Sequence, residues 1–469
     1  MLLVKFKYTT ELFLVLCAVG LFALIQVLYG VMTQPYFWDE LGVYSGAANH
    51  LYQHGLSLLP SAMPDSLSRG HPLFCAFYFA LAFKLFGNTP MVAHLAGAAF
   101  SIIGLIYLYK LLAIKWPKPY AFIGSLSLFV QPLFLSQTIL VLPESLLLVC
   151  TLAALYHYLQ AQNIACMVWL ILALQIKESA LVLPIAFMLA NAIKHKRLWP
   201  KNSWYLGIIP IASFALFIGI QKLQNGYYFY PLHTELASFD GYFIAERWHD
   251  FLQFFLYDQG HNMQWLLSLL FISLPYVFKH KPFKLNLQAN SISILIIIVG
   301  GLGFMVLNYF LTRYTQYFFI LIYLIVFELA YATAIQNKWW LYLYPIALAI
   351  IGLWYWNPNQ KYTDIDFTYS QHVKTVKACI DELKQTNYND KTIGMEFPAC
   401  ASYWSSNNGY DIQFKHEMRL IGDSSKAKDY MVFTMPGNLA DTAKYRGKIQ
   451  CVKRFNQGYA AAYLYKVLP

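Results

Sequence analysis

Charged residues are scarce in this sequence of 469 residues: they make up 12%, whereas hydrophobic residues make up 58%. The apolar residues form blocks of about twenty, which is the length that crosses a bilayer. This composition argues against a soluble globular fold. The net charge of +11 does not indicate a nucleic-acid partner. Lys and Arg stand in short clusters between the apolar blocks, where they act as topology signals.

Metal-binding cysteine spacings and a removable signal peptide are also lacking. None of the seven cysteines forms a C-x-x-C pair, so the sequence predicts no zinc site. Cys379, Cys400 and Cys451 lie in a polar C-terminal region, where a disulfide would leave one of them unpaired. The first apolar block has no small-residue cleavage site after it and is predicted to remain as a membrane helix.

About eleven membrane-spanning helices are expected, because each span needs about twenty apolar residues. The block at 164–193 is longer than one span needs and is interpreted as two short helices that meet at Lys177 and Glu178. The apolar segment at 71–87 is too short and is predicted to be interfacial, within the first external loop. The other spans are expected near 12–31, 91–113, 120–138, 143–160, 203–221, 261–278, 291–311, 315–335 and 339–355.

The basic clusters test this arrangement through the positive-inside rule. Lys5 and Lys7 place the N-terminus in the cytoplasm. If the interfacial segment does not span, all later clusters fall on the same side as the N-terminus. These clusters are Lys110, Lys115 and Lys118; Lys194, Lys196, Arg197 and Lys201; Lys279, Lys281 and Lys284; and Lys338.

The C-terminal region from about residue 357 then lies outside and differs in composition from the rest. It is polar, with a helical pattern at 373–383 and alternating patterns typical of strands at 430–434, 449–455 and 461–467. The predicted fold is therefore a polytopic α-helical membrane domain, residues 1–356, followed by a small extracytoplasmic (periplasmic) α/β domain, residues 357–469.

Ionisable residues near the external membrane face are the candidates for chemistry, because charge there is costly unless it binds or reacts. Asp39 and Glu40 directly follow the first span. A carboxylate there can accept a proton from a hydroxyl, although Asp39 also fits a helix cap. Glu144 begins the fourth span, where an acidic side chain also stabilises a helix N-terminus.

Two cations belong to the same predicted face. Arg313, beside Tyr314, can bind a phosphate in bidentate fashion or can extend to the interface from a helix end. Lys177 can neutralise Glu178 or bind a carrier phosphate. The aromatic loop at 227–258, which contains His233, is predicted to pack rather than to contact a sugar.

The order of these motifs resembles the membrane-integral C-type glycosyltransferases, and most closely the protein O-mannosyltransferases and aminoarabinose transferases. The resemblance covers about the first 330 residues. Relatives often have a second proline where this chain has His71, an aspartate in place of Glu144, and a glycine in place of Glu178. The matching motifs are Trp38-Asp39-Glu40 with Tyr44, Gly70-His71-Pro72-Leu73, Ser136-Gln137 through Glu144-Ser145, Lys177-Glu178 and Arg313-Tyr314.

The resemblance implies an inverting transfer of a sugar from polyprenyl phosphate to a hydroxyl of a glycan, lipid or protein, at the outer face of a bacterial inner membrane. Asp39 would be the catalytic base. In some relatives carboxylates of both loops bind a divalent metal, but the mannosyl and aminoarabinosyl branches are metal-independent, so no catalytic metal or other cofactor is expected. Positive charge from Arg313 and Lys177 would stabilise the phosphate leaving group. The substrate-binding residues would be Glu40, Tyr44, His71, Glu144, Lys177, Arg313 and Tyr314.

Two other interpretations stay open. A transporter or flippase for a lipid-linked or polar solute would also be polytopic, but transporters place charges near the membrane midplane, often within internal repeats. No internal repeat is found here. An assembly protein that uses its C-terminal region to bind a partner would explain that region but not the ordered carboxylates.

Overall fold

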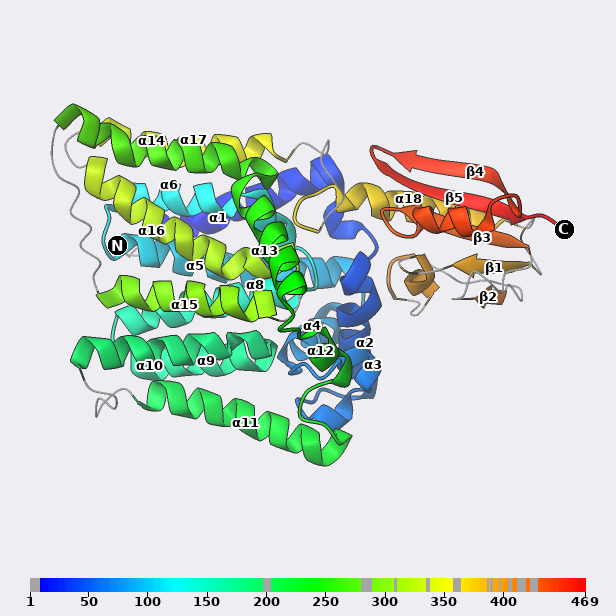
Figure 1. The fold of residues 1–469 in the computed structure, drawn as a ribbon, viewed down its shortest axis with the longest axis horizontal. Coiled ribbons are helices and arrows are strands. Elements are labelled where there is room, and N and C mark those ends of the chain that lie inside the picture. Colours follow the sequence, from blue (N-terminus) through cyan, green and yellow to red (C-terminus); the bar gives the residue numbers. More distant parts are fainter. Residues whose placement is uncertain are drawn as a thin grey trace, which may run out of the picture.

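The computed structural model contains a helical bundle with an α/β domain at one end, and the N-terminal helix begins toward the opposite end (Figure 1). The long helices of the bundle run roughly side by side. The described residues are 9–196, 204–279, 289–307, 310–334, 338–356, 364–385, 388, 391–395, 397, 399–403, 407–410, 419–421 and 429–469.

Each predicted span coincides with one or two helices of the bundle. Within the described residues, four helical stretches are long and apolar enough to cross a membrane: Thr10–Tyr29, Pro90–Ala113, Tyr205–Asn225 and Thr312–Tyr331. The bundle helices are α1 (Thr9–Tyr29), α5 (Pro90–Ala113), α6 (Lys118–Phe129), α7 (Pro132–Gln137), α8 (Pro143–Leu159), α9 (Asn163–Ile176), α10 (Val182–His195), α11 (Tyr205–Asn225), α14 (His261–Lys279), α15 (Ala289–Leu307), α16 (Gln316–Ala334) and α17 (Lys338–Trp354).

One predicted span is interrupted. The range 120–138 was expected to be a single helix, but α6 ends at Phe129 and α7 begins at Pro132. Proline has no N–H for the helical ladder and its ring clashes with the preceding turn, so it occupies the first position of a new helix instead. The predicted corner at Lys177 is present: Lys177 is extended between α9 and the 3-10 turn η4 (Glu178–Leu181), which leads into α10.

The two long loops that are predicted to be external form short helices. In the first loop, α4 coincides with the segment predicted to be interfacial and packs on α2 and α5. Figure 1 shows α2 and α3 at the end of the bundle that faces the α/β domain, and α13 running across the bundle helices. These elements are η1 (Val31–Thr33), η2 (Glu40–Tyr44), α2 (Ser45–His54), η3 (Pro60–Ala62), α3 (Asp65–Ser68), α4 (Phe74–Phe86), α12 (Pro231–Leu236), α13 (Gly241–Leu256) and η5 (Asp258–Gly260).

The C-terminal region forms a five-stranded sheet in the order β2-β1-β3-β5-β4, with α18 (Tyr369–Leu383) packed on β4 and β5. The predicted helix and three strands are confirmed as α18, β3 (Tyr430–Met435), β4 (Ile449–Gln457) and β5 (Ala460–Val467). The strands β3, β4 and β5 pair antiparallel, whereas β1 pairs parallel with β2 and β3. The sequence patterns missed β1 (Thr392–Met395) and β2 (Arg419–Ile421), and the region also has 3-10 turns η8 (Ala399–Tyr403) and η10 (Leu439–Tyr445).

The segment before α18 attaches this domain to the bundle. The side chains of Ser136 and Gln137 both donate to the carbonyl oxygen of Asp364, at 3.0 and 2.6 Å. Gln259 Nε2 donates to the carbonyl of Ile365 at 2.7 Å. These hydrogen bonds hold the start of the C-terminal region against α7 and η5. The cysteines of this region, Cys379, Cys400 and Cys451, form no disulfide.

Candidate active site

Arg313 lies at the centre of a cluster of ion pairs. It belongs to η6 (Thr312–Thr315), the turn that leads into α16, and its side chain is only 5% exposed. Its Nη2 pairs with Asp39, its Nη1 lies 2.5 Å from Asp364 Oδ2, and its Nε lies 3.7 Å from Glu144 Oε1. Three carboxylates from distant parts of the chain therefore share one guanidinium group.

Lys177 joins this cluster through Glu144. Its Nζ donates to Glu144 Oε1 at 2.8 Å and lies 3.6 Å from the centre of the Tyr314 ring, a cation–π contact. Glu144 is in the first turn of α8, and Lys177 is in the extended link after α9. Because Glu144 is 4% exposed and contacts both cations, its main role in this arrangement is to hold Lys177 and Arg313 beside each other.

Asp39 is presented by an unusual backbone conformation. The preceding residue, Trp38, has φ 46°, a left-handed value that is costly for a residue with a bulky side chain. The Trp38 ring packs on Phe397 and His372 of the α/β domain, with ring centres 5.1 and 6.3 Å away. Asp39 makes no side-chain cap bond to η2. Its carboxylate pairs with Arg313 and is 25% exposed, more than the 4% of Glu144 and the 17% of Asp364.

Two neighbouring groups have shifted pKa values. Burial, together with the nearby charge of Glu144, raises the pKa of the Tyr44 phenol well above its usual range, so this hydroxyl stays protonated and can donate a hydrogen bond. Burial also raises the pKa of Asp364, although Arg313 opposes the shift. The structure thus gathers six of the residues singled out from the sequence, Asp39, Tyr44, Glu144, Lys177, Arg313 and Tyr314, and adds Asp364.

Glu40 was predicted to bind substrate, but its side chain is buried among protein groups. Its side chain is 1% exposed, and its oxygens accept hydrogen bonds from the N–H groups of Phe37 (3.0 Å) and Val141 (2.8 Å). His94 Nε2 lies 3.0 Å from the same oxygen as Val141. Since protein groups surround this carboxylate, the structure supports a structural role for Glu40, which connects the chain after α1 with the segment between α7 and α8.

Glu40→Ala is expected to destabilise the protein, because it leaves two buried N–H groups and the His94 ring without their acceptor, at a cost of about 3 kcal/mol. Thermal unfolding in detergent should shift down by a few degrees. Glu235→Ala, which removes an exposed carboxylate of α12, is the matched control and should leave the midpoint unchanged. Equal midpoints for the two variants would contradict the structural role.

His71 lies on the other side of the Lys177 corner. Its Nδ1 is 2.9 Å from Glu178 Oε2, and its ring lies 4.7 Å from that of His233, measured between ring centres. Burial alone would raise the pKa of Glu178, but the charge and hydrogen bond of His71, together with the charge of Lys177, lower it to about 2. Burial, with His71 beside it, lowers the pKa of His233 to about 4, so this imidazole is neutral at pH 7. The three side chains line a cavity of about 300 Å³.

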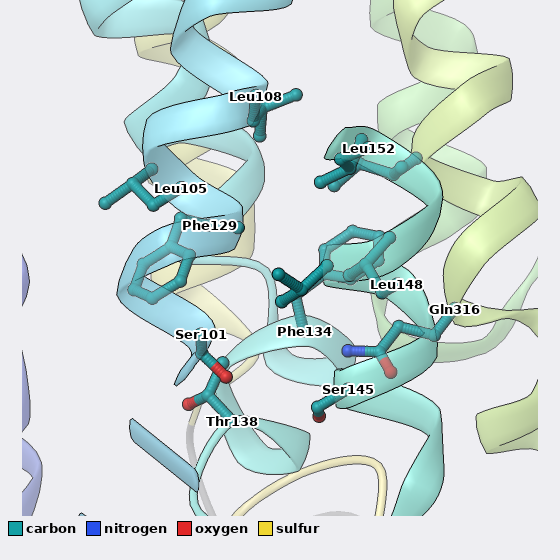
Figure 2. Close-up of a pocket in the computed structure, with 13 residues that line it drawn as sticks. Ser101, Leu105, Leu108, Phe129, Phe134, Thr138, Ser145, Leu148, Leu152 and Gln316 are labelled. Atoms are coloured by element: carbon teal, nitrogen blue, oxygen red, sulfur yellow. The ribbon is translucent and has the colours of Figure 1, made fainter. Parts of the chain in front are cut away.

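A second cavity lies inside the bundle, between α5, α8 and α16. It has a volume of about 20 Å³, close to that of one water molecule, and is therefore too small for a sugar. Among the described residues, the amide of Gln316 and the hydroxyl of Ser101 are buried there without hydrogen-bond partners. Figure 2 shows polar side chains at one end of this cavity, Ser101, Thr138, Ser145 and Gln316, and leucines at the other, Leu105, Leu108 and Leu152.

Asp364 and His233 were missed as site residues. Asp364 lies nine residues beyond the last predicted span, which ends at 355, so a search confined to the external ends of the spans does not include it. His233 was noted but assigned to packing. No short spacing connects it to Glu178 or His71, because the three residues come from separate loops that only the fold brings together.

Comparison with known proteins gives one family match and several similar folds. Residues 70–219 match the family described as dolichyl-phosphate-mannose-protein mannosyltransferase. No curated protein matches the chain in sequence. ArnT from Cupriavidus metallidurans bound to undecaprenyl phosphate is 10% identical and has a TM-score of 0.57, with 98% of each chain covered.

Two further solved structures are similar. ArnT from the same organism in the apo state is 10% identical with a TM-score of 0.51, and covers 96% of this chain and 97% of its own. The Archaeoglobus fulgidus oligosaccharyltransferase tethered with an acceptor peptide is 10% identical and has a TM-score of 0.49. The match covers 93% of this chain and 70% of the oligosaccharyltransferase chain. The apolar helices, the family match and the shared fold together identify an integral membrane protein that resembles the C-type glycosyltransferases in sequence and in architecture.

Proposed function

We propose that this protein moves a sugar from a polyprenyl-phosphate donor to a hydroxyl acceptor at the outer face of a bacterial inner membrane, with inversion at the anomeric carbon. The observation that carries this proposal is the pairing of Asp39, the most exposed carboxylate of the cluster, with Arg313. A base beside fixed positive charge is what transfer from a phosphate leaving group requires.

In the proposed reaction, the acceptor oxygen attacks the anomeric carbon while its proton passes to Asp39. The bond between this carbon and the phosphate oxygen breaks, and the electron pair stays on the phosphate. A phosphate departs as an anion and needs no general acid, so stabilising positive charge from Arg313 and Lys177 is sufficient. A single displacement inverts the anomeric configuration.

The donor must first change the contacts of Arg313. Its guanidinium group already faces Asp39, Asp364 and Glu144, so a phosphate that approaches Arg313 competes with these carboxylates. Asp39 is the most exposed of the three and is therefore the one most readily replaced. We expect donor binding to release Asp39 from Arg313, which would make its lone pairs available to the acceptor proton in the step that needs them.

The nature of the donor is supported by the relatives. The similar ArnT structure is bound to undecaprenyl phosphate, and the matching family is described by its use of dolichyl-phosphate mannose. Both carriers are polyprenyl phosphates. The sugar and the acceptor, whether lipid, protein or another glycan, are left open by this proposal.

A transporter or flippase has less support. Glu144 begins α8, Lys177 follows α9, and Arg313 precedes α16, so the charged side chains of this cluster lie at helix ends. Transporters place such groups near the membrane midplane, within broken helices.

The proposed function is tested by mass spectrometry of lipids and glycoproteins from cells that lack this chain. The expected result is the loss of one sugar increment from one class of molecule, restored by the wild-type protein. Accumulation of the corresponding polyprenyl-phosphate sugar would accompany it. If all glycolipids and glycoproteins keep their masses, the glycosyltransferase proposal is wrong.

A further inference from the structure

His71, Glu178 and His233 form a cluster that the proposed reaction does not use. They come from the first external loop, the corner between α9 and α10, and helix α12, respectively. Their potential ligand atoms all lie within 4.8 Å of one another, and all three side chains are partly buried. No other trio of histidine, cysteine or acidic side chains in the described part of the chain comes together in this way.

The chemistry of this trio is that of a transition-metal site. Two imidazoles and one carboxylate are a common ligand set for zinc that leaves a fourth position open. Ligand atoms about 2.1 Å from a tetrahedral zinc ion lie about 3.4 Å from each other. His71 Nδ1 and Glu178 Oε2 are 2.9 Å apart, and no two ligand atoms of the trio are more than 4.8 Å apart. Small side-chain shifts would therefore bring all three to the separation that zinc requires. At 17% and 24% exposure, these two side chains have room to make them.

The charges of the neighbouring cluster favour a cation here. Four carboxylates, those of Asp39, Glu144, Glu178 and Asp364, lie around Arg313 and Lys177. Arg69, whose charge acts on His233, is the third permanent cation nearby, so the carboxylates outnumber the permanent cations by one. Lys177 is adjacent to Glu178 in the chain and pairs with Glu144. A divalent ion at Glu178 would offset this excess of negative charge, whereas a donor phosphate that arrives alone would increase it.

We infer that His71, Glu178 and His233 bind a zinc-type divalent cation whose open coordination position faces the 300 Å³ cavity. The cavity wall carries the aromatic rings of Phe214, Phe217 and Tyr230 beside these ligands. An ion at its edge offers a phosphate oxygen a ligand position next to an apolar wall suited to a lipid chain. Binding of the ion stands independently of the proposed function, but its role toward the donor phosphate rests on that function.

The site is tested by metal analysis of the full-length protein, purified in detergent with a tag other than polyhistidine. After addition of zinc chloride and dialysis, the wild type should retain about one zinc ion per chain. His233→Ala and Glu178→Gln should each bind zinc at least tenfold more weakly. His249→Ala, which removes a strongly exposed histidine of the nearby helix α13, is the matched control and should retain the ion.

Cobalt binding to the wild-type protein tests the site without relying on the folding of the variants. Cobalt should bind the metal-free wild type with the intense visible absorption of a tetrahedral site, and zinc should displace it. Wild-type protein that retains no zinc and shows no such absorption would overturn the inference. Loss of zinc from His249→Ala to the same extent as from His233→Ala would also overturn it.

A second measurement tests whether the bound ion contacts the donor phosphate. Undecaprenyl phosphate should bind the zinc-loaded protein at least tenfold more tightly than the metal-free protein. Equal affinities would remove the phosphate role and leave a structural metal site. Tight zinc binding in a protein whose absence changes no glycan would refute the proposed function and not the site.

Discussion

Replacing Asp39 by asparagine should reduce sugar transfer by at least about a hundredfold, the size of effect that a positioned general base contributes. Asparagine has nearly the same shape, and its side-chain oxygen can still accept a hydrogen bond from Arg313. It cannot accept the proton of the acceptor hydroxyl. The guanidinium group keeps Asp364 and Glu144 as partners, so the cluster should survive the change.

The measurement is the restoration of the missing sugar increment in cells that lack the wild-type chain, with membrane levels of each variant determined in parallel. Asp250→Asn is the matched control, because Asp250 is an exposed carboxylate of α13, outside the cluster. This control should restore the increment fully. A variant Asp39→Asn that is inserted normally and restores the increment at the wild-type rate would refute the assignment of the base.

Replacing Arg313 by lysine should weaken the binding of undecaprenyl phosphate at least tenfold, the equivalent of about 1.4 kcal/mol. Lysine keeps one charge but loses the planar fork of N–H groups that binds two oxygens at once. Arg313→Ala should in addition lower the stability of the folded protein. It leaves Asp39, Glu144 and Asp364 without their shared cation, and uncompensated charge of this kind costs about 3–5 kcal/mol.

Binding is measured on purified protein in detergent by titration with undecaprenyl phosphate, and stability by thermal unfolding of the same samples. Arg454→Lys, which changes an exposed arginine on β4 of the α/β domain, is the control and should match the wild type in both. If Arg313→Lys binds the lipid phosphate as tightly as the wild type does, Arg313 is not its ligand and the direction of donor approach must be revised.

Much of the fold could be predicted because membrane helices are specified locally. A block of about twenty apolar residues satisfies its own backbone hydrogen bonds within the bilayer, so its position can be found without knowing its neighbours. The alternating patterns of β3, β4 and β5 were also readable, since each strand is at least six residues long. Short strands such as β2, with three residues, have too little pattern to be recognised.

The candidate site was predictable only in part. Asp39, Glu144, Lys177 and Arg313 were selected because each is a charge at the external end of a predicted span, and topology alone places such residues at one face. Topology does not say which of them touch. Glu40 illustrates this limit, because it adjoins Asp39 in the chain yet is enclosed by His94 and two backbone N–H groups.

The membrane character of this protein, the approximate positions of its helices and the face on which its charges gather could all be predicted from the amino-acid sequence. These properties follow from local hydrophobicity and from the distribution of lysine and arginine. The pairing of Asp39 with Arg313, in place of a helix cap, is apparent only in the folded chain. The same is true of Asp364, which completes the cluster, and of the close approach of His71, Glu178 and His233. These are contacts between distant segments, and helix packing determines them.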